Sequence, residues 1–175
     1  MKGVIIDCFS KMITSKMGEE KWIEILLDAG FTKFTVFPPY SDVPEEYFDR
    51  ILKTIQKSLG KSENEVADDF GEYWMTVYAP QTYPQFFNEA KCSKDFILMM
   101  DFVHRKVTED IPYSKPPHFE YKFVDENTIQ IYYYSSRHLI SFLEGLIKGT
   151  TKYFNEEIEI EKISENCLQL TFSKK

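Results

Sequence analysis

One histidine stands within the apolar stripe of a predicted helix, where its imidazole could bind a metal or a cofactor. Residues 93–107 read SKDFILMMDFVHRKV and have the length of a buried helix. A spacing of three and four places five side chains on one helical face: Phe96, Ile97, Met100, His104 and Val107. His104 is either a core histidine that hydrogen-bonds a backbone carbonyl or a ligand to a metal or haem iron, and this helix alone leaves both interpretations open.

A second group of polar side chains lies in a predicted strand. Tyr133, Ser135 and Arg137 are two residues apart, so an extended chain would project them from one face, about 6–7 Å from one to the next. Two hydroxyls and a guanidinium in a row would bind a carboxylate or phosphate. The same residues could also form an exposed strand end in which Arg137 pairs with a surface carboxylate.

The two groups complement each other as parts of a haem site. Haem needs an apolar slot, an axial ligand and donors for its two propionates. His104 could supply the ligand, and the Tyr133, Ser135 and Arg137 row could supply the donors. The chain has 15 Phe, 11 Tyr and 2 Trp, which fit either a large aromatic core or a pocket for a flat apolar ligand.

Helices come first in the 175-residue chain and strands follow. Apolar periodicity and end signals predict helices at residues 2–17, 19–29, 44–60, 62–78, 83–90 and 93–107. After the stiff SKPP segment at 114–117, a candidate lobe boundary, the pattern predicts strands at 118–124 and 128–134, a helix at 139–154, and strands at 158–163 and 167–172. This order predicts an α+β fold with a four-stranded antiparallel sheet.

Local signals set the helix ends and the buried faces. Gly30 is expected just past the end of the second helix, Ser62 and Glu65 form a capping box, and Ser93 is expected to cap the His104 helix. The inward residues are expected to be Ile5, Cys8, Phe9, Met12 and Ile13 in the first helix and Trp22, Ile23, Leu26 and Leu27 in the second.

Composition excludes several classes of function. A net charge of −7 argues against nucleic acid and against an anionic membrane surface as partners. Three scattered cysteines without CxxC spacing read as reduced thiols, with Cys8 and Cys167 in the core and Cys92 beside the His104 helix. With no signal peptide or membrane span, we expect a cytoplasmic protein. No nucleophile or phosphate-loop motif indicates an enzyme, and the acidic pairs at 68–69 and 156–157 read as solvated faces.

The sequence resembles the H-NOX (haem-nitric oxide/oxygen binding) domains, relatives of the haem domain of soluble guanylate cyclase. The matching features are the opening MKG, the helix ending in DFVH, the Pro-Pro pair, the Y-x-S-x-R motif and the FLEGLIKG run. The resemblance covers essentially the whole chain. It implies one domain over 1–175, in which a helical lobe at 1–60 packs over a haem-ligating lobe at 61–175, with haem b (iron protoporphyrin IX) between them.

The resemblance also implies roles for particular residues. His104 would be the iron ligand, and Tyr133, Ser135 and Arg137 would hold the propionates. Pro117 matches the position that presses on the porphyrin and distorts it. The other haem-contacting residues would be Met100 in the His104 helix and the distal-pocket residues Ile5, Phe9, Trp74, Tyr78, Phe142 and Leu146.

A sensor of nitric oxide is the function that the resemblance implies. Oxygen-binding members place a Tyr where this chain has Phe142, so we expect NO and CO binding with little stable O₂ binding, although Trp74 and Tyr78 carry donors. NO would break the iron–His104 bond, relax the haem and shift the N-terminal lobe. The signal would go to a separate histidine kinase or cyclic-di-GMP enzyme. An O₂ sensor or gas carrier, a haem enzyme and an interaction domain without haem are the alternatives.

Overall fold

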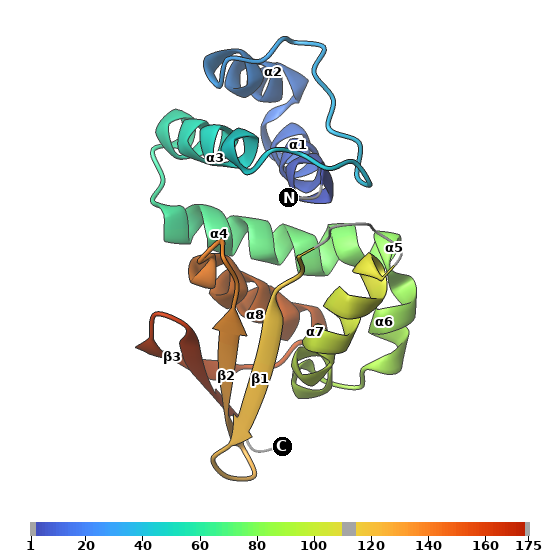
Figure 1. The fold of residues 1–175 in the computed structure, drawn as a ribbon, viewed down its shortest axis with the longest axis vertical. Coiled ribbons are helices and arrows are strands. Elements are labelled where there is room, and N and C mark those ends of the chain that lie inside the picture. Colours follow the sequence, from blue (N-terminus) through green and yellow to red (C-terminus); the bar gives the residue numbers. More distant parts are fainter. Residues whose placement is uncertain (1–2, 110–114, 174–175) are drawn as a thin grey trace. The chain divides into compact units, whose positions relative to one another are not determined.

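The computed structural model describes residues 3–109 and 115–173 (Figure 1). The chain divides into two compact units, Met1–Phe70 and Gly71–Lys175. This division falls within helix α4 (Glu63–Tyr73). The segment at 114–117, our other candidate boundary, lies inside the second unit, because strand β1 follows it directly and joins the sheet; its first residue is outside the described residues. No helix of the described part is long and apolar enough to span a membrane.

The first unit is built from α1 (Gly3–Met17), α2 (Glu19–Asp28), α3 (Glu45–Leu59) and most of α4. Ile5 and Leu27, which were predicted to face inward, are not fully buried. Ile6 is fully buried in α1, whereas Ile5 is half-buried. Leu27 is 53% exposed, and the buried stripe of α2 is Trp22, Ile25 and Leu26. That stripe continues to Ala29 at helical spacing, which turns Leu27 to solvent.

Two predicted helix-end signals are confirmed, at Gly30 and at Ser62 with Glu65, and the predicted cap at Ser93 is wrong. Gly30 has a φ of +79°, which suits glycine just past a helix end. Ser62 and Glu65 bond each other's backbone N–H groups as a capping box, at 3.3 and 2.8 Å. The helix of His104, however, takes Cys92 as its N-cap, and Ser93 is its first residue.

The second unit contains the remaining elements. The helix predicted to Tyr78 is not regular, because α4 passes into the π-helix η1 (Trp74–Tyr78). The other elements are α5 (Ala79–Thr82), α6 (Pro84–Glu89), α7 (Ser93–Thr108), β1 (His118–Phe123), β2 (Thr128–Tyr134), α8 (Ile140–Phe154), β3 (Ile158–Ser164) and β4 (Cys167–Phe172).

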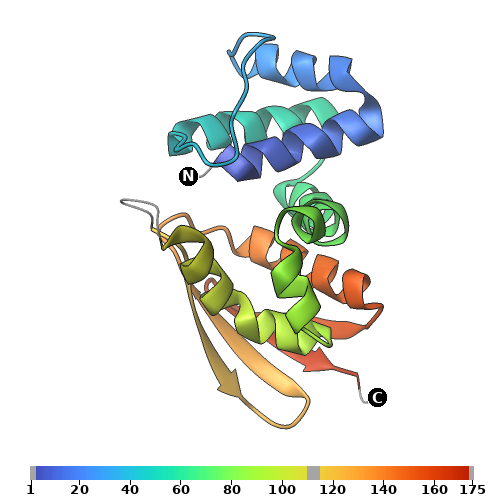
Figure 2. The ribbon, with the colours of Figure 1, turned by 90° about the vertical axis from the view of Figure 1, so that its right-hand side faces the viewer.

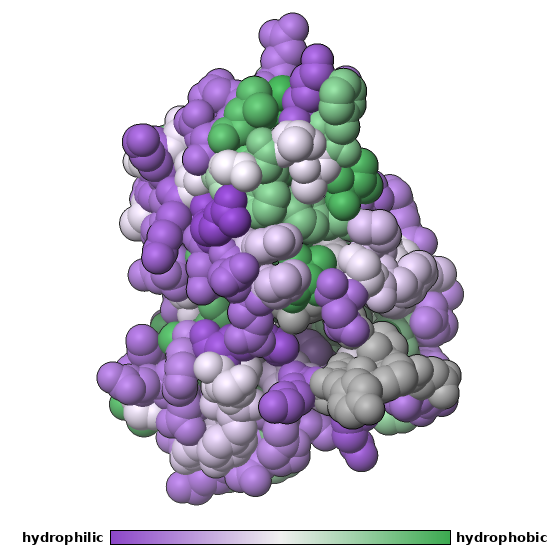
Figure 3. Space-filling model, turned by 45° about the horizontal axis from the view of Figure 1, so that its top comes forward, coloured by the Kyte–Doolittle hydropathy of each residue, from purple (hydrophilic) through white to green (hydrophobic). Residues whose placement is uncertain are grey.

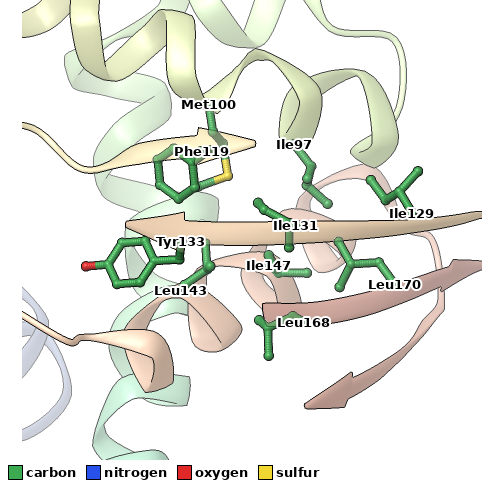
Figure 4. Close-up of a cluster of buried hydrophobic side chains, with 10 residues drawn as sticks. All are labelled: Ile97, Met100, Phe119, Ile129, Ile131, Tyr133, Leu143, Ile147, Leu168 and Leu170. Carbon is green, nitrogen blue, oxygen red and sulfur yellow. The ribbon is translucent and has the colours of Figure 1, made fainter. Parts of the chain in front are cut away.

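The four strands form one antiparallel sheet in the order β1-β2-β4-β3. Alternate residues of β2, Ile129, Ile131 and Tyr133, are buried on one face, as the period of two predicts. Helices α7 and α8 cover this face (Figure 2), with Ile97 and Ile147 reaching into the same cluster (Figure 4). The predicted α+β fold is therefore confirmed, and its sheet provides the support for α7.

Candidate functional site

His104 lies in the last turns of α7, where its ring is in a state suited to binding a metal. Its Nδ1 is 2.8 Å from the carbonyl oxygen of Met100, one turn earlier. Because a carbonyl oxygen only accepts, Nδ1 carries the hydrogen and Nε2 carries the lone pair of the neutral ring. Burial lowers the pKa of His104, although the Met100 hydrogen bond acts in the opposite direction. The neutral ring therefore carries its lone pair on Nε2, the atom through which an imidazole in this tautomer could bind a metal.

An aromatic row links His104 to the polar motif at the end of β2. The ring of Phe119 lies 5.3 Å from that of His104 and 5.6 Å from that of Tyr133, centroid to centroid. Met100 lies against Phe119, and the hydroxyl of Tyr133 points away from the aliphatic cluster (Figure 4). Three of the predicted site residues thus share one apolar wall.

Polar contacts attach α7 to β1. The N–H of Phe119 donates to Asp101 Oδ1 at 3.1 Å, and Nδ1 of His118 lies 2.8 Å from the same oxygen. The hydroxyl of Tyr121 donates to the carbonyl of Ile97 at 2.8 Å. Since Asp101 is about one turn before His104, these contacts attach the His104 part of α7 to β1.

The other end of α7 is attached by Glu156, which follows α8. Its Oε2 accepts hydrogen bonds from Ser93 N–H at 2.8 Å and from Ser93 Oγ at 2.6 Å. A carboxylate there satisfies an unpaired N–H of the first helical turn and interacts favourably with the helix dipole. The prediction that Glu156 belongs to a solvated face is therefore wrong. Its neighbour Glu157, which was part of the same prediction, is exposed.

The Tyr133, Ser135 and Arg137 motif is not an extended row. Strand β2 ends at Tyr134, and the next residues turn, with Arg137 N–H donating to Ser135 Oγ at 3.2 Å. His138, at a φ of 51°, completes the turn, and its N–H donates to the Ser135 carbonyl at 3.4 Å. A serine hydroxyl that bonds the backbone two residues on competes with the strand ladder and ends it. The prediction of one extended face is thus wrong.

The same turn lies beside the loop of Pro117. Arg137 Nη1 donates to the Lys115 carbonyl at 3.2 Å. Pro117 precedes β1, and the first pair of the β1–β2 ladder is His118 with Tyr134. The structure therefore gathers Pro117, the motif and, through Phe119, His104 at one end of the sheet.

Three glycines bring α4 and α8 into backbone contact. A Cβ on Gly71 would lie 2.1 Å from the carbonyl carbon and oxygen of Gly145, and one on Gly149 would lie 2.2 Å from the carbonyl oxygen of Gly71. Distances this short leave no room for any side chain. We call this contact the glycine crossing.

Four predicted pocket residues flank the glycine crossing. Trp74 and Tyr78 follow Gly71 at helical spacing on η1, and their rings stack at 5.2 Å and 23°. On α8, Phe142 and Leu146 share the stripe of the crossing glycines. Phe142 is 5% exposed and has no hydrogen-bond donor. A short π-helix within an α-helix, such as η1, is often associated with a functional site.

The crossing and α7 pack on one shared cluster. Trp74 and Leu146 pack against this cluster, and so do Val103 and Val107 of α7. Its buried members are Met75, Ala79, Phe86, Phe87, Ala90 and Phe96. The positions of the crossing residues relative to the His104 helix are therefore set by continuous packing within the second unit.

Two predicted pocket residues belong to the first unit. Phe9 is fully buried there, with its ring 4.7 Å from that of Phe70 and 6.4 Å from that of Phe48. Ile5 is half-buried on α1. Phe9 thus contributes to the core of its own unit.

The donor set fits a haem better than a metal ion held by protein side chains alone. Among the described residues, no group of three or more His, Cys, Asp or Glu side chains could hold a metal ion. His104 is instead a single nitrogen ligand on an apolar wall, which is the arrangement for an axial ligand of haem iron. The Arg137 guanidinium and the Ser135 hydroxyl lie at the end of that wall, where propionates would need donors.

Sequence reasoning missed several residues that position this site. Asp101 and Glu156 hold α7, Phe119 links His104 to Tyr133, and the crossing glycines set the other helices. The Gly-x-x-x-Gly spacing of Gly145 and Gly149 was a visible signal for close helix approach. Glu156 gave none, because its partner Ser93 lies 63 positions away.

Comparison with known proteins places this arrangement among haem-binding sensor domains. The family described as Haem-NO-binding matches residues 2–162. The chain therefore belongs to the haem-NO-binding, or H-NOX, family, whose members are sensor domains rather than enzymes and carry haem, consistent with haem b. No curated protein matches the chain.

Solved H-NOX structures share the fold over nearly the whole chain. An oxygen-binding H-NOX domain related to soluble guanylate cyclases, in its oxygen complex, has a TM-score of 0.87 at 26% identity and covers 99% of this chain and 96% of its own. A mutant of T. tengcongensis H-NOX has a TM-score of 0.85 at 26% identity, with 99% and 98% coverage. A structure concerned with haem redox potential and protein-induced porphyrin distortion has a TM-score of 0.87 at 26% identity, with 98% and 100% coverage.

Proposed function

We propose that this chain is a ferrous haem sensor that binds NO and CO, forms little stable complex with O₂, and signals to a separate protein through His104. The carrying observation is the Nδ1 hydrogen bond from His104 to the Met100 carbonyl, which leaves Nε2 available on an apolar wall. Bound haem would supply an iron with an open position for a diatomic gas.

The proximal side would hold haem by shape and by charge. His104 would bind the iron through Nε2, with Met100 and Phe119 against the porphyrin. Tyr133, Ser135 and Arg137 would donate hydrogen bonds to the propionates from the turn after β2. Pro117, in the loop that Arg137 contacts, would press on the porphyrin edge.

The proposed gas preference is supported by the residues around the glycine crossing. Bound O₂ carries negative charge on its outer oxygen and is stabilised by a buried donor, whereas NO needs no such help. Phe142 offers no donor, and Leu146 is apolar. A missing buried donor costs orders of magnitude where a ligand demands one. On the resemblance to the family alone, we also propose Ile5 and Phe9 as haem-contacting residues.

Signalling would pass along α7. Loss of the His104 bond to iron would remove the constraint on the last turns of this helix, while Asp101 and Glu156 keep it attached to the sheet and to the segment after α8. The outcome would be a population shift between two packings, with the first unit responding. A histidine kinase or a cyclic-di-GMP enzyme of the cytoplasm would receive the signal.

The first test is the absorption spectrum of the reduced protein under argon, then with NO, CO and air. We expect a haem band that shifts with NO and CO and does not form a stable complex in air. His104→Ala should lose the native axial ligation. An unchanged spectrum of His104→Ala would sink the ligand assignment.

Phe142→Tyr tests the gas preference directly. A hydroxyl added at this buried position should raise O₂ affinity by at least about tenfold, the value of one well-placed hydrogen bond. Gas titration of the reduced protein measures it. An O₂ affinity that does not rise would assign the preference to another feature of the pocket, such as the bulk of Trp74.

An O₂ sensor or carrier is the second candidate. Its supporting observations are the donors on Trp74 and Tyr78, whose rings stack beside the crossing, and the similarity to an oxygen-binding domain. A stable complex in air that Trp74→Phe or Tyr78→Phe removes would favour it.

A further inference from the structure

The loop between α2 and α3 exposes three large apolar side chains within seven residues. Phe34, Val36 and Tyr40 are 80%, 77% and 79% exposed. Apolar residues gather on this part of the N-terminal unit in Figure 3, bordered by hydrophilic ones. We call Phe34, Val36 and Tyr40 the loop patch. Concentrated exposed apolar surface of this kind commonly marks an interaction site.

The loop patch is held on a structured loop. Phe37 is buried, and its ring meets that of Phe31 edge-on at 5.4 Å. Thr32 and Thr35 bond each other across the turn, at 3.0 Å between their hydroxyls. A loop that buries Phe37 while presenting its neighbours to solvent fixes the patch, which lowers the entropic cost of binding to it.

A groove opens beside the loop patch, with a volume of about 250 Å³. It runs between α1, α2 and the loop, and its apolar lining consists of Ile6, Trp22, Ile23, Leu26, Val36 and Phe37. Val36 belongs to both features, so the patch and the groove form one surface. Asp7 and Glu19 lie at the groove, and so does Lys33. Ser10, Thr14 and Thr35 complete the lining, so the groove suits a segment that carries both apolar and polar side chains.

The surroundings of this surface are acidic. Residues 18–50 contain eight Asp and Glu against three Lys and Arg, so this fifth of the chain carries −5 of the total charge of −7. All three of its cations are already engaged within the chain. Arg50 bonds the Ala29 carbonyl and lies over the Phe31 ring, Lys21 pairs with Glu24, and Lys33 lies 4.9 Å from the centroid of the Phe34 ring. The electrostatic complement is therefore basic.

We propose that the loop patch and its groove dock a basic amphipathic helix of a separate protein. Apolar residues of that helix at i, i+3 or i+4 and i+7 would enter the groove and pack on Phe34, Val36 and Tyr40, while its Lys and Arg residues face the acidic rim. A second copy of this chain would bring like charge to like charge, and an anionic membrane would be repelled as well. The docking extends the proposed function by naming the output surface, but it needs neither haem nor gas.

The test uses the full haem-loaded chain and two synthetic peptides of about 18 residues. One carries Leu at helical spacing and Lys elsewhere, and the other replaces each Lys by Glu. Fluorescence anisotropy of the labelled peptides should show binding of the basic peptide that weakens with salt, and no binding of the acidic one. NMR shifts should map to residues 31–37 and to α2.

Two matched variants decide where the peptide binds. A triple variant, Phe34→Ser with Val36→Ser and Tyr40→Ser, should weaken binding by at least about tenfold, as expected for loss of central apolar contacts. The control is Phe123→Ser with Val124→Ser, at the β1–β2 turn, where the side chains are 63% and 50% exposed. This control should leave the affinity unchanged, and both variants should keep the wild-type haem spectrum.

Three outcomes would overturn the proposal. They are equal binding of the acidic peptide, unchanged affinity in the triple variant, and self-association in sedimentation that the triple variant abolishes, which would make a second copy the occupant. Glu19→Lys sharpens the charge argument, because it should weaken binding of the basic peptide and improve that of the acidic one. Since His104→Ala should still bind the peptide, failure of the haem assignment and failure of the docking surface are distinguishable.

Discussion

Two parts of the second unit hold their helices by different physics. Helix α7 is attached by polar contacts, from Asp101 to β1 and from Glu156 to its first residue. The glycine crossing is held by backbones that meet directly at Gly71 and Gly145. A single polar contact can be lost at a moderate cost in free energy. Two backbones in direct contact, by contrast, have no flexible side chain between them that could move aside. The crossing therefore tolerates no added side chain, whereas the polar contacts at α7 supplement its apolar packing and can be removed one at a time.

The largest predicted effect comes from a side chain in the crossing. Gly71→Val would place a Cβ 2.1 Å from the carbonyl of Gly145, so α4 and α8 must separate. We expect a loss of about 3 kcal/mol or more in the free energy of unfolding, at or above the upper range for overpacked cores. Urea denaturation followed by circular dichroism measures it.

Gly60→Ala is the control for this variant. Gly60 has a φ of +63° and open space where its Cβ would stand, so only the cost of the left-handed backbone applies, about 1–2 kcal/mol. If Gly71→Val costs no more than Gly60→Ala, the crossing does tolerate an added side chain.

The contrast also explains what the sequence could predict. Helix and strand periodicity located α7 and all four strands within about two residues, because burial of one face imposes a regular spacing. Caps such as Ser62 with Glu65 were visible because their partners are three positions apart. The motif at Tyr133, by contrast, was read as an extended strand, since its composition does not reveal that the Ser135 hydroxyl bonds the Arg137 N–H.

Features that depend on contacts between distant parts of the chain could not be predicted from sequence periodicity or capping signals. The π-helix at Trp74 has no local signal that separates it from a regular helix. Leu27 obeyed the helical spacing as well as Ile25 did, and only the packing of α2 decided which one is buried. The structural role of a residue was thus predictable where its sequence neighbours determine that role. It was not predictable where packing between distant parts of the chain determines it.

A smaller effect is predicted at the first turn of α7. Glu156→Ala removes the acceptor of two hydrogen bonds from Ser93, a fully buried residue. We expect a loss of about 2 kcal/mol in the free energy of unfolding, in the range for hydrogen bonds to a charged group. Thermal unfolding, with the haem spectrum as a second readout of the His104 position, measures it.

Glu157→Ala is the matched control, because this neighbour has the same charge and an exposed side chain. Its effect should stay within about 0.5 kcal/mol, as for ordinary surface positions. Equal losses in the two variants would mean that Glu156 acts through net charge and not through α7.

The smallest predicted effect on stability is at Asp101, whose titratable carboxyl attaches α7 to β1. Partial burial acts to raise the pKa of Asp101, but the hydrogen bonds from Phe119 N–H and His118, with the charges of His118 and Arg105, hold the pKa below its usual value. A carboxyl whose folded pKa is lowered contributes stability above its unfolded pKa of about 3.9 and loses that contribution as the pH falls through the folded pKa.

Asp101→Asn keeps an acceptor for Phe119 N–H and removes the charge. We expect it to lower stability by about 1 kcal/mol or less at neutral pH, since the partner side chains are largely exposed. The difference from the wild type should shrink as the pH falls below about 4, where the native carboxylate is protonated as well. Urea denaturation at a series of pH values tests this. A difference that stays constant down to pH of about 2.5 would show that Asp101 holds α7 by shape, as the glycines hold the crossing, and the contrast between the two regions would then fail.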